Sequence, residues 1–320
     1  MKARILLPLL CTACLALGCG PRKTAAPVSL TRDFPHAEIP SMVSDPNQRM
    51  SWLVQHFWDR YTATDSLYYS DSVTVNGVTL ENLEKQVGVF ATLLQEEPLA
   101  EGEAAMTALY RRMEAFQLCF PEANLLPELT ALVGRYFYDP NSPVRSEELY
   151  LPFARCLAAS ELLEPLSRER YAREARLCAL NRPGTPAANF SFVDSFGKKR
   201  TLYGIKAELT LLIFGHPDCQ ACRELQAVME ENEALSQAIA SGELKVVDIY
   251  IDEDIDAWKA HVADYPASWI NGYDPGFVIR TELLYDVRAV PSLYLLSQDK
   301  TVLLKDATPE SFFAALGFAQ

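Results

Sequence analysis

The feature that most constrains the fold of this chain is a pair of cysteines, Cys219 and Cys222, separated by two residues. An apolar run over 209–214 and a short break precede the pair, and the apolar spacing after it predicts a helix over 223–240. A strand, a tight turn and two cysteines on the first turn of a helix are typical of a thiol–disulfide exchange site. A helix N-terminus favours negative charge and so stabilises the reactive thiolate. We therefore predict that Cys219 is the exposed nucleophile and that Cys222, one turn deeper, resolves the mixed disulfide.

Two other interpretations of this cysteine pair are weaker on physical grounds. A purely structural disulfide between Cys219 and Cys222 would close a very short loop and contribute little stability through chain entropy. A zinc site would need two more ligands, and no second such cysteine pair or histidine pair lies in the same half of the sequence. Redox chemistry is therefore the favoured interpretation, and no metal site is predicted.

The N-terminal segment predicts export and attachment to a membrane. A positively charged start precedes an apolar stretch, 5–17, that is too short to span a bilayer as a mature helix. The following sequence Ala-Leu-Gly-Cys ends at Cys19 and resembles a bacterial lipoprotein signal, with Cys14 as the alternative acceptor. The resemblance implies that residues 1–19 form a signal peptide and that lipidated Cys19 anchors the protein to a membrane.

The residues after Cys19 set the expected location. They include no acidic run resembling a surface-export signal, so we expect a lipid-anchored envelope protein at the outer membrane that faces the periplasm. Residues 20–45 are rich in Pro, Ser, Thr and Ala and are predicted to form a flexible tether. The net charge of −13 opposes binding to nucleic acid, and to anionic membrane surfaces beyond the lipid anchor.

The first half of the chain, 46–181, has the periodicity of a helical bundle joined by short connections. Asp45 can cap a helix that begins at Pro46. Residues 73–78 could form a small hairpin. The aromatic stripes are expected to be core rather than a ligand site. Helices are predicted over 46–61, 83–94, 103–119, 127–138, 146–159 and 167–180.

Three further cysteines lie in this half: Cys119, Cys156 and Cys178. Because their number is odd, at least one cannot pair within the domain. A bridge between Cys156 and Cys178 and a set of buried free thiols are both compatible with the sequence.

The second half, 182–320, alternates strands and helices. The run 244–251 is apolar apart from its start, which suits a buried central strand. Strands are predicted over 184–196, 209–214, 244–251, 289–296 and 301–304, with helices over 223–240, 254–265 and 309–316.

Short motifs in this half carry a family resemblance. They are G-x-P-A-x-x-F at 184–190, D-x-x-G-K at 194–198, the cysteine pair, Y-I-D at 250–252 and V-P-S at 290–292. With these motifs, residues 184–320 resemble the TlpA/ResA branch of thioredoxin-like thiol–disulfide oxidoreductases.

The resemblance implies an α/β thioredoxin-like domain in which helices flank a central mixed sheet. It also implies that Pro291 is a cis-proline packed beside the cysteine pair and that Val290 presents its backbone groups to the substrate. The only redox group would be the disulfide formed by Cys219 and Cys222, without a bound cofactor.

A second resemblance covers residues 45–320. The phrases Trp-Asp-Arg-Tyr at 58–61 and Tyr-Asp-Pro-Asn-Ser-Pro at 138–143 are similar to bacterial envelope lipoproteins in which an all-α helical domain of unknown function precedes a thioredoxin-like module. The expected organisation is a signal peptide (1–19), a tether (20–45), a helical domain (46–181) and a thioredoxin-like domain (182–320).

Some positions depart from the family's pattern. Asp218 stands where a tryptophan often precedes the first cysteine, and Ile213 stands where thioredoxins have a buried acid. Leu225 occupies the place of a TlpA-type glutamate, although Glu224 lies one residue earlier. These departures argue against proton shuttling by a buried carboxylate. Glu224 and His216 are then the auxiliary candidates, His216 because imidazole titrates near neutrality, although a solvated loop histidine is the other interpretation.

The sequence thus predicts a membrane-tethered thiol–disulfide oxidoreductase of the bacterial cell envelope. Its partners would be envelope proteins with thiols or disulfides, and a membrane-embedded thiol carrier as electron donor. The competing hypothesis is a non-catalytic binding lipoprotein that uses the thioredoxin fold as a scaffold and the helical domain to capture a partner. A peroxidase is less consistent with the sequence, because Pro217 alone does not make the motif of such enzymes.

Overall fold

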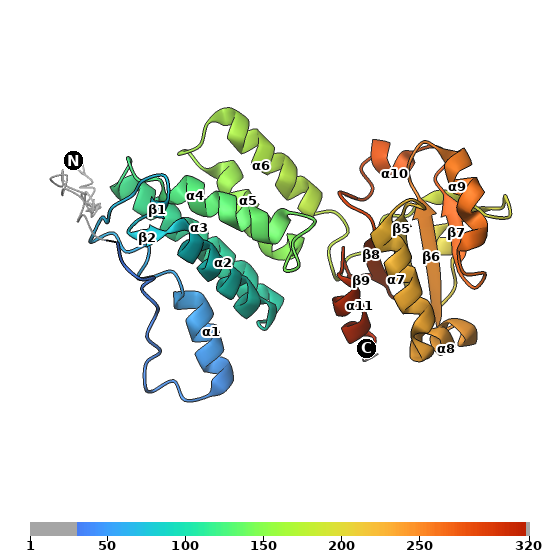
Figure 1. Ribbon diagram of the computed structural model, residues 1–320, viewed down its shortest axis with the longest axis horizontal. Coiled ribbons are helices and arrows are strands. Elements are labelled where there is room, and N and C mark those ends of the chain that lie inside the picture. The colour runs from blue at the N-terminus through green and yellow to red at the C-terminus, as the bar shows by residue number, and fades with distance from the viewer. Residues whose placement is uncertain (1–30, 318–320) are drawn as a thin grey trace, which may run out of the picture.

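The computed structural model describes residues 31–317, so the predicted signal peptide, Cys19 and the start of the tether lie outside the described residues. The described chain forms a helical part and a part built around a sheet, which lie side by side (Figure 1). Buried residues between Phe34 and Cys178 form one core, and buried residues between Ala187 and Phe313 form two more, one on each face of the sheet.

The helical part contains a helix in every region where the sequence predicts one. The predicted helix over 127–138 changes character at Gly134, where the α-helix gives way to a π-helical turn. The helices are α1 (Pro46–His56), α2 (Leu80–Gln95), α3 (Leu99–Cys119), α4 (Leu125–Val133), η1 (Gly134–Tyr138), α5 (Glu147–Ala159) and α6 (Pro165–Cys178).

Short polar side chains cap the N-termini of α1, α2 and α5. The carboxylate of Asp45 accepts a hydrogen bond from the backbone N–H of Gln48 at 2.9 Å, and Pro46 is the first residue of α1, as predicted. Ser146 caps α5 in the same way, with 3.3 Å between its Oγ and the nitrogen of Leu149. The position of α5 is important below, because its first residues face the sheet-containing part.

The small hairpin at 73–78 is also present. Strands β1 (Thr74–Val75) and β2 (Val78–Thr79) pair antiparallel. Their turn is Asn76-Gly77, with φ angles of 47° and 82°, which is the conformation that a two-residue hairpin loop requires.

The aromatic residues that follow α1 are core residues. Phe57, Trp58 and Tyr61 are at most 3% exposed and surround Phe34, with ring centroids 5.2–5.5 Å from it. Phe34 lies in the segment predicted to be a flexible tether, but it is 3% exposed and belongs to this core. The hydroxyl of Tyr61 donates to the carbonyl oxygen of Val75 at 2.8 Å and so ties the hairpin to this core. The expectation that this stripe serves packing is confirmed.

The sheet of the second part is mixed, and within the described residues it has seven strands. They are β3 (Ser191–Asp194), β4 (Lys199–Thr201), β5 (Leu209–Gly215), β6 (Leu244–Tyr250), β7 (Ile270–Tyr273), β8 (Ser292–Leu296) and β9 (Val302–Leu304). Their order is β4-β3-β7-β6-β5-β8-β9. Strands β5, β6 and β7 run parallel to one another, and the remaining pairs are antiparallel.

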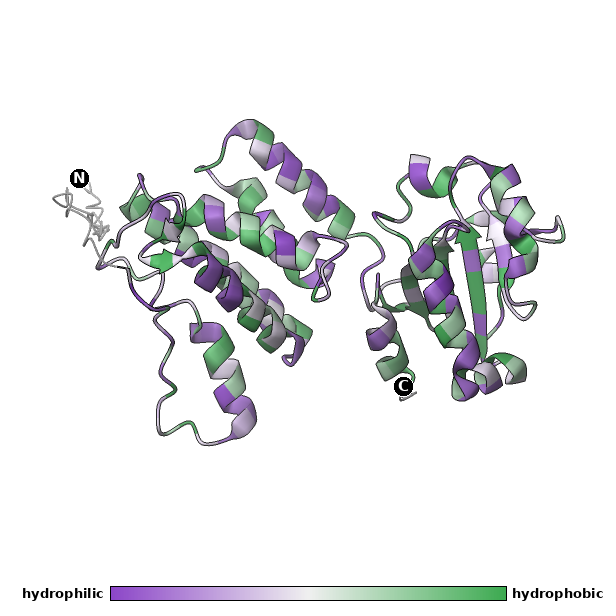
Figure 2. Ribbon diagram, viewed as in Figure 1, coloured by the Kyte–Doolittle hydropathy of each residue, from purple (hydrophilic) through white to green (hydrophobic). Residues whose placement is uncertain are grey.

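Helices cover both faces of this sheet. They are η2 (Leu202–Gly204), α7 (Gln220–Glu231), α8 (Glu233–Ser241), α9 (Ile255–His261), η3 (Val262–Asp264), α10 (Val278–Thr281) and α11 (Pro309–Ala315). Because side chains alternate along a strand, Ile213 of β5 packs toward α7, α8 and α11, whereas Leu212 packs toward Ile279 of α10 and Tyr285. The central strands are mostly hydrophobic along their length (Figure 2), as predicted for strands buried on both faces.

Several features of this part differ from the prediction. The strand expected over 184–196 is limited to β3, Ser191–Asp194. The single helix expected over 223–240 is divided, because the side chain of Asn232 accepts a hydrogen bond from the nitrogen of Leu235 at 2.9 Å and starts α8. Strands β4 and β7 and the helix α10 are additional elements. They are three or four residues long, which is too short to give a recognisable apolar period.

Within residues 31–317, no helix is long and apolar enough to cross a membrane.

Candidate functional site

Cys219 lies at the N-cap position of α7. Its sulfur accepts a hydrogen bond from the backbone N–H of Cys222, with 3.2 Å between the two atoms. Its thiol also donates to the carbonyl oxygen of Val290 at 3.5 Å. Both cysteines are free thiols, and neither is fully buried. The first cysteine is therefore held by a helix N-terminus that favours negative charge.

The sheet places the proline loop beside this helix end. Strand β8 pairs antiparallel with β5, with Ser292 opposite Phe214, so the residues before Ser292 lie next to the end of β5. The peptide bond between Val290 and Pro291 is cis, as the resemblance implies. The carbonyl oxygen of Val290 thereby faces the sulfur of Cys219.

Cys222 faces the interior of the site. Burial raises the pKa of its thiol, and a hydrogen bond with Cys219 and the nearby charge of Asp248 raise it further, whereas a hydrogen bond from the backbone of His216 lowers it. At neutral pH this thiol is protonated, so it must lose a proton before it can act as a nucleophile.

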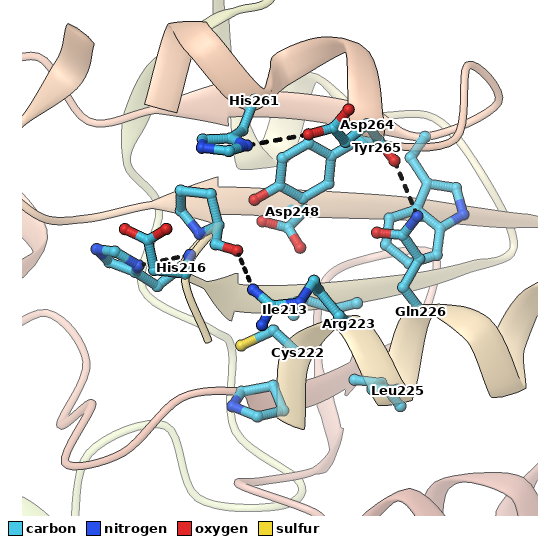
Figure 3. Close-up of a pocket in the computed structure, with 14 residues that line it drawn as sticks. Ile213, His216, Cys222, Arg223, Leu225, Gln226, Asp248, His261, Asp264 and Tyr265 are labelled. Atoms are coloured by element: carbon cyan, nitrogen blue, oxygen red, sulfur yellow. Dashed lines mark hydrogen bonds and ion pairs between the residues drawn. The ribbon is translucent and has the colours of Figure 1, made fainter. Parts of the chain in front are cut away.

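A cavity of about 310 Å³ opens beside Cys222 (Figure 3). It lies between α7 and the segment from α9 to Trp269, and Pro291 closes one side. The side chain of Gln226 donates to the carbonyl oxygen of Asp264 at 3.0 Å and so holds α7 to that segment. The remaining lining residues include Ile213, Arg223, Leu225, His261 and Tyr265.

Asp248 brings a buried carboxyl group to this cavity. It is 5% exposed and lies opposite Ile213 in the parallel pairing of β5 and β6. Burial raises its pKa to about 7. In Figure 3 it lies in the cavity beside Tyr265. Beyond the effect of burial, the negative charge of Asp248 raises the pKa of Tyr265 and the pKa of the Cys222 thiol.

Gly215 leaves the space that this carboxyl group needs. A Cβ atom at Gly215 would lie 3.1 Å from Oδ2 and 3.2 Å from Oδ1 of Asp248. The carboxylate therefore rests against the backbone at the end of β5, one residue before the loop that leads to the cysteine pair.

Comparison with known proteins agrees with this architecture. Residues 18–181 match the family described as a domain of unknown function, DUF5106. A thioredoxin-like protein from Bacteroides caccae ATCC 43185 has 34% sequence identity to the chain and a TM-score of 0.80. The match covers 90% of this chain and 99% of that one. The chain belongs to the DUF5106-containing thioredoxin-like proteins.

Other solved structures match a smaller share of the chain. The C-terminal domain of an uncharacterized protein from Bacteroides fragilis NCTC 9343 is 45% identical, covering 43% of this chain and 98% of its own, with a TM-score of 0.42. The C-terminal domain of a putative thiol-disulfide oxidoreductase from Bacteroides thetaiotaomicron is 21% identical, covering 43% and 95%, with a TM-score of 0.37. No curated protein matches the chain.

The auxiliary residues predicted for the thioredoxin-like domain lie in different places. His216 lines the cavity, but its Nδ1 accepts the backbone N–H of Asp218 at 3.1 Å and its Nε2 lies 3.8 Å from a carboxylate oxygen of Asp252. Glu224 is on the exposed face of α7, where it accepts a hydrogen bond from Gln220 at 2.8 Å. Glu224 is not among the residues that line the cavity beside Cys222.

The departures from the family pattern have simple structural consequences. Leu225 is 5% exposed and packs in the core between α7 and the sheet, and the side chain of Asp218 is exposed. The sequence argument considered only the positions of Ile213 and Leu225, and it overlooked a buried carboxyl group that lines the cavity. The neighbouring strand supplies the carboxyl group instead, through Asp248.

A signal for Asp248 exists in the sequence. In the strand over 244–250, alternation places Asp248 on the same face as Leu244 and Val246, which is a buried face. A carboxylate in a central strand is costly to bury, so its presence there makes Asp248 a candidate functional residue.

The cysteines of the DUF5106 domain are free thiols. Cys119 is exposed, Cys156 is partly buried and Cys178 is buried. The structure therefore has free thiols rather than the bridge between Cys156 and Cys178. Within residues 31–317 there is no cluster of side chains that could hold a metal ion.

Proposed function

We propose that this protein is a thiol–disulfide oxidoreductase that reduces disulfides in other proteins of the bacterial cell envelope. The observation that carries the proposal is the position of Cys219, at a helix N-terminus and 3.5 Å from the carbonyl oxygen of Val290 beside a cis-proline. A thiolate there is stabilised by the helix and is flanked by a backbone edge on which a peptide substrate can lie.

In the first step, the thiolate of Cys219 attacks one sulfur of a substrate disulfide. The substrate S–S bond breaks, a mixed disulfide with Cys219 forms, and the departing substrate thiolate takes a proton from solvent. The exposed side of Cys219 allows this attack, because the residue is only partly buried.

In the second step, Cys222 releases the substrate. Asp248 accepts the thiol proton of Cys222, and the resulting thiolate attacks the sulfur of Cys219. The mixed disulfide breaks, the second substrate sulfur leaves as a thiolate that is then protonated, and a disulfide joins Cys219 and Cys222. Two electrons have then passed from the enzyme dithiol to the substrate disulfide.

Asp248 suits this proton transfer for two reasons. It lies in the same cavity as Cys222, and its pKa of about 7 lies close to neutral pH. A general base works best when its pKa is near the working pH, since it must both accept and release the proton.

The enzyme disulfide must be reduced again after each turnover. In the cell envelope this requires a dithiol electron donor, for which a membrane-embedded thiol carrier is our proposal. The lipoprotein signal ending at Cys19 supports a tether that keeps the protein at the membrane, with the domains facing the periplasm.

Insulin reduction by dithiothreitol tests the activity. The wild-type protein should accelerate it, whereas Cys219→Ser should not, and Cys119→Ser should behave as the wild type because Cys119 is exposed at the end of α3 in the DUF5106 domain. Equal rates with and without wild-type protein would contradict the proposal and favour the binding alternative.

A separate experiment tests the tether. Globomycin treatment or Cys19→Ala should block processing of the precursor and change its membrane attachment. Unchanged processing and attachment would contradict the lipoprotein assignment without affecting the proposed redox activity.

A further inference from the structure

The DUF5106 domain contacts the residues that lead into the cis-proline. These residues, 286–291, are called the proline segment below. The guanidinium of Arg288 donates to the backbone oxygen of Tyr138 and lies 4.1 Å above that tyrosine's ring. It also forms an ion pair with Glu147, with 2.5 Å between Nη2 and Oε1. Both partners belong to the DUF5106 domain, and Arg288 is two residues before Val290.

Glu147 links this contact to a second one. Its other carboxylate oxygen lies 2.6 Å from Nζ of Lys305, which also donates to the backbone oxygens of Cys178 and Leu180. The side chains of Glu147 and Lys305 are 4% and 1% exposed. Glu147 is the first residue of α5, where the helix N-terminus favours its negative charge.

A third contact reaches the other side of the cis-proline. Arg145 of the DUF5106 domain pairs with Asp306, with 3.2 Å between Nε and Oδ2, and it also donates to the backbone oxygen of Asp306 at 3.1 Å. The second carboxylate oxygen of Asp306 accepts a hydrogen bond from Ser292 at 2.7 Å. Ser292 follows Pro291 directly, so the two contacts hold the residues on both sides of the cis-proline.

These ion pairs differ from ordinary surface pairs in their burial. Exposed pairs contribute little, because solvent screens them and the side chains are free to move. A buried pair with additional hydrogen bonds fixes the relative position of the groups that carry it, and removal of one partner leaves an uncompensated charge. Arg288 and Asp306 are each 15% exposed. The contacts therefore restrain the proline segment relative to α5.

We propose that Glu147 and Arg145 are positioning residues for the proposed oxidoreductase. Glu147 acts through Arg288, and Arg145 acts through Asp306. Together they hold the backbone of Val290 beside Cys219, where a protein substrate must lie. The inference rests on the proposed function and assigns a role to the DUF5106 domain. It predicts that loss of these contacts harms the reduction of protein disulfides more than that of small disulfides, which need no backbone contact with Val290.

The test uses the full-length protein with Glu147→Gln and, as a second variant, Asp306→Asn. The second substitution retains the shape of the side chain, and asparagine tolerates the positive φ of 44° at this position. The matched control is Glu84→Gln, which removes the exposed ion pair with Arg135 in the same domain. Thermal unfolding identifies any variant that does not fold.

Two readouts are compared. One is kcat/KM for insulin and for hydroxyethyl disulfide. The other is the amide hydrogen exchange of residues 286–292 relative to α7, which does not depend on redox activity.

We expect Glu147→Gln and Asp306→Asn to lower kcat/KM for insulin by about tenfold, because small misplacement of a positioning group is costly. The rate with hydroxyethyl disulfide should stay within about twofold of wild type, since the Cys219 thiolate itself is intact. Exchange of residues 286–292 should become faster by about tenfold, while exchange in α7 is unchanged. Glu84→Gln should resemble the wild type in both readouts.

Unchanged insulin reduction and unchanged exchange in the folded variants would overturn the inference. Equal losses for insulin and hydroxyethyl disulfide would also overturn it, because they would indicate general destabilisation. If the wild-type protein reduces neither substrate, the proposed function fails, whereas the exchange measurement still decides whether the DUF5106 domain restrains the segment.

Discussion

Asp248 on β6 lies directly opposite Ile213 on β5 in the parallel register of the sheet. Ile213 occupies the position at which thioredoxins have a buried acid. In this protein the buried carboxyl group is instead that of Asp248, which lies on the neighbouring strand and on the same face of the sheet as Ile213. Gly215 provides the space for it. The proposed chemistry follows from this arrangement, because it gives the half-buried thiol of Cys222 a proton acceptor.

Replacement of Asp248 should slow the release of the substrate. General acid–base groups typically contribute about 100-fold or more, so we expect Asp248→Asn to slow the resolving step by about 100-fold. The initial attack by Cys219 should change much less. Rapid quenching with acid should then trap more mixed disulfide in the variant than in the wild type, and equal amounts would argue against proton transfer by Asp248.

The same substitution should change the pH dependence of stability. The carboxyl group binds its proton more tightly in the folded protein, where its pKa is about 7, than in the unfolded chain, where it is about 3.9. The free energy of unfolding should therefore fall as the pH rises from about 4 to about 7, by up to about 4 kcal/mol. Urea unfolding should show Asp248→Asn to be more stable than wild type at pH 8, and an advantage that is equally large at about pH 4 would contradict this account.

Gly215→Ala should disturb the site through the carboxyl group of Asp248. The added carbon would lie 3.1 Å from Oδ2, so the carboxyl group must shift. We expect a loss of about 1–3 kcal/mol in stability, as for other overpacked sites, together with slower turnover. Gly134→Ala is the matched control, since a Cβ at Gly134 has nothing within 4 Å; equal turnover in the two variants would rule out the proposed role of Gly215.

The thiols of the DUF5106 domain should differ in reactivity. Burial raises the pKa of Cys178, and this thiol is fully buried, whereas Cys119 is exposed. In the native protein, iodoacetamide should modify Cys119 quickly and Cys178 only after unfolding, which peptide mass spectrometry can measure. A Cys156–Cys178 disulfide in the purified protein would contradict the free-thiol assignment.

The sequence predicts those parts of the site that depend on short stretches of neighbouring residues. Cys219, Cys222 and the cis-proline at 291 each follow from a few neighbouring residues and from a strand that places them. The position of Asp248 opposite Ile213 required the register of β5 and β6, because the two residues are 35 positions apart in the sequence. The role of Asp248 was missed for this reason, although its place in a buried strand was a signal.

The contacts between the two domains also join residues that are far apart in the sequence, so the sequence alone does not predict them. Glu147 and Arg288 are 141 residues apart in the sequence. From the sequence alone, each is expected to be an exposed charged residue, because Glu and Arg are mostly exposed. Helix periodicity predicted α5, but periodicity gives no information about which residue of another domain the helix meets. The role inferred for the DUF5106 domain therefore needs the three-dimensional structure.

The reduction potential of the Cys219–Cys222 couple, measured on protein lacking residues 1–19, shows whether this pair can reduce protein disulfides. We expect a reducing value close to that of thioredoxin, about −270 mV, which suits a reductase supplied with electrons by a dithiol donor. A value near −120 mV, where the strong oxidant of the periplasm lies, would contradict the proposed direction of electron flow. A disulfide too stable to titrate would contradict the redox role itself.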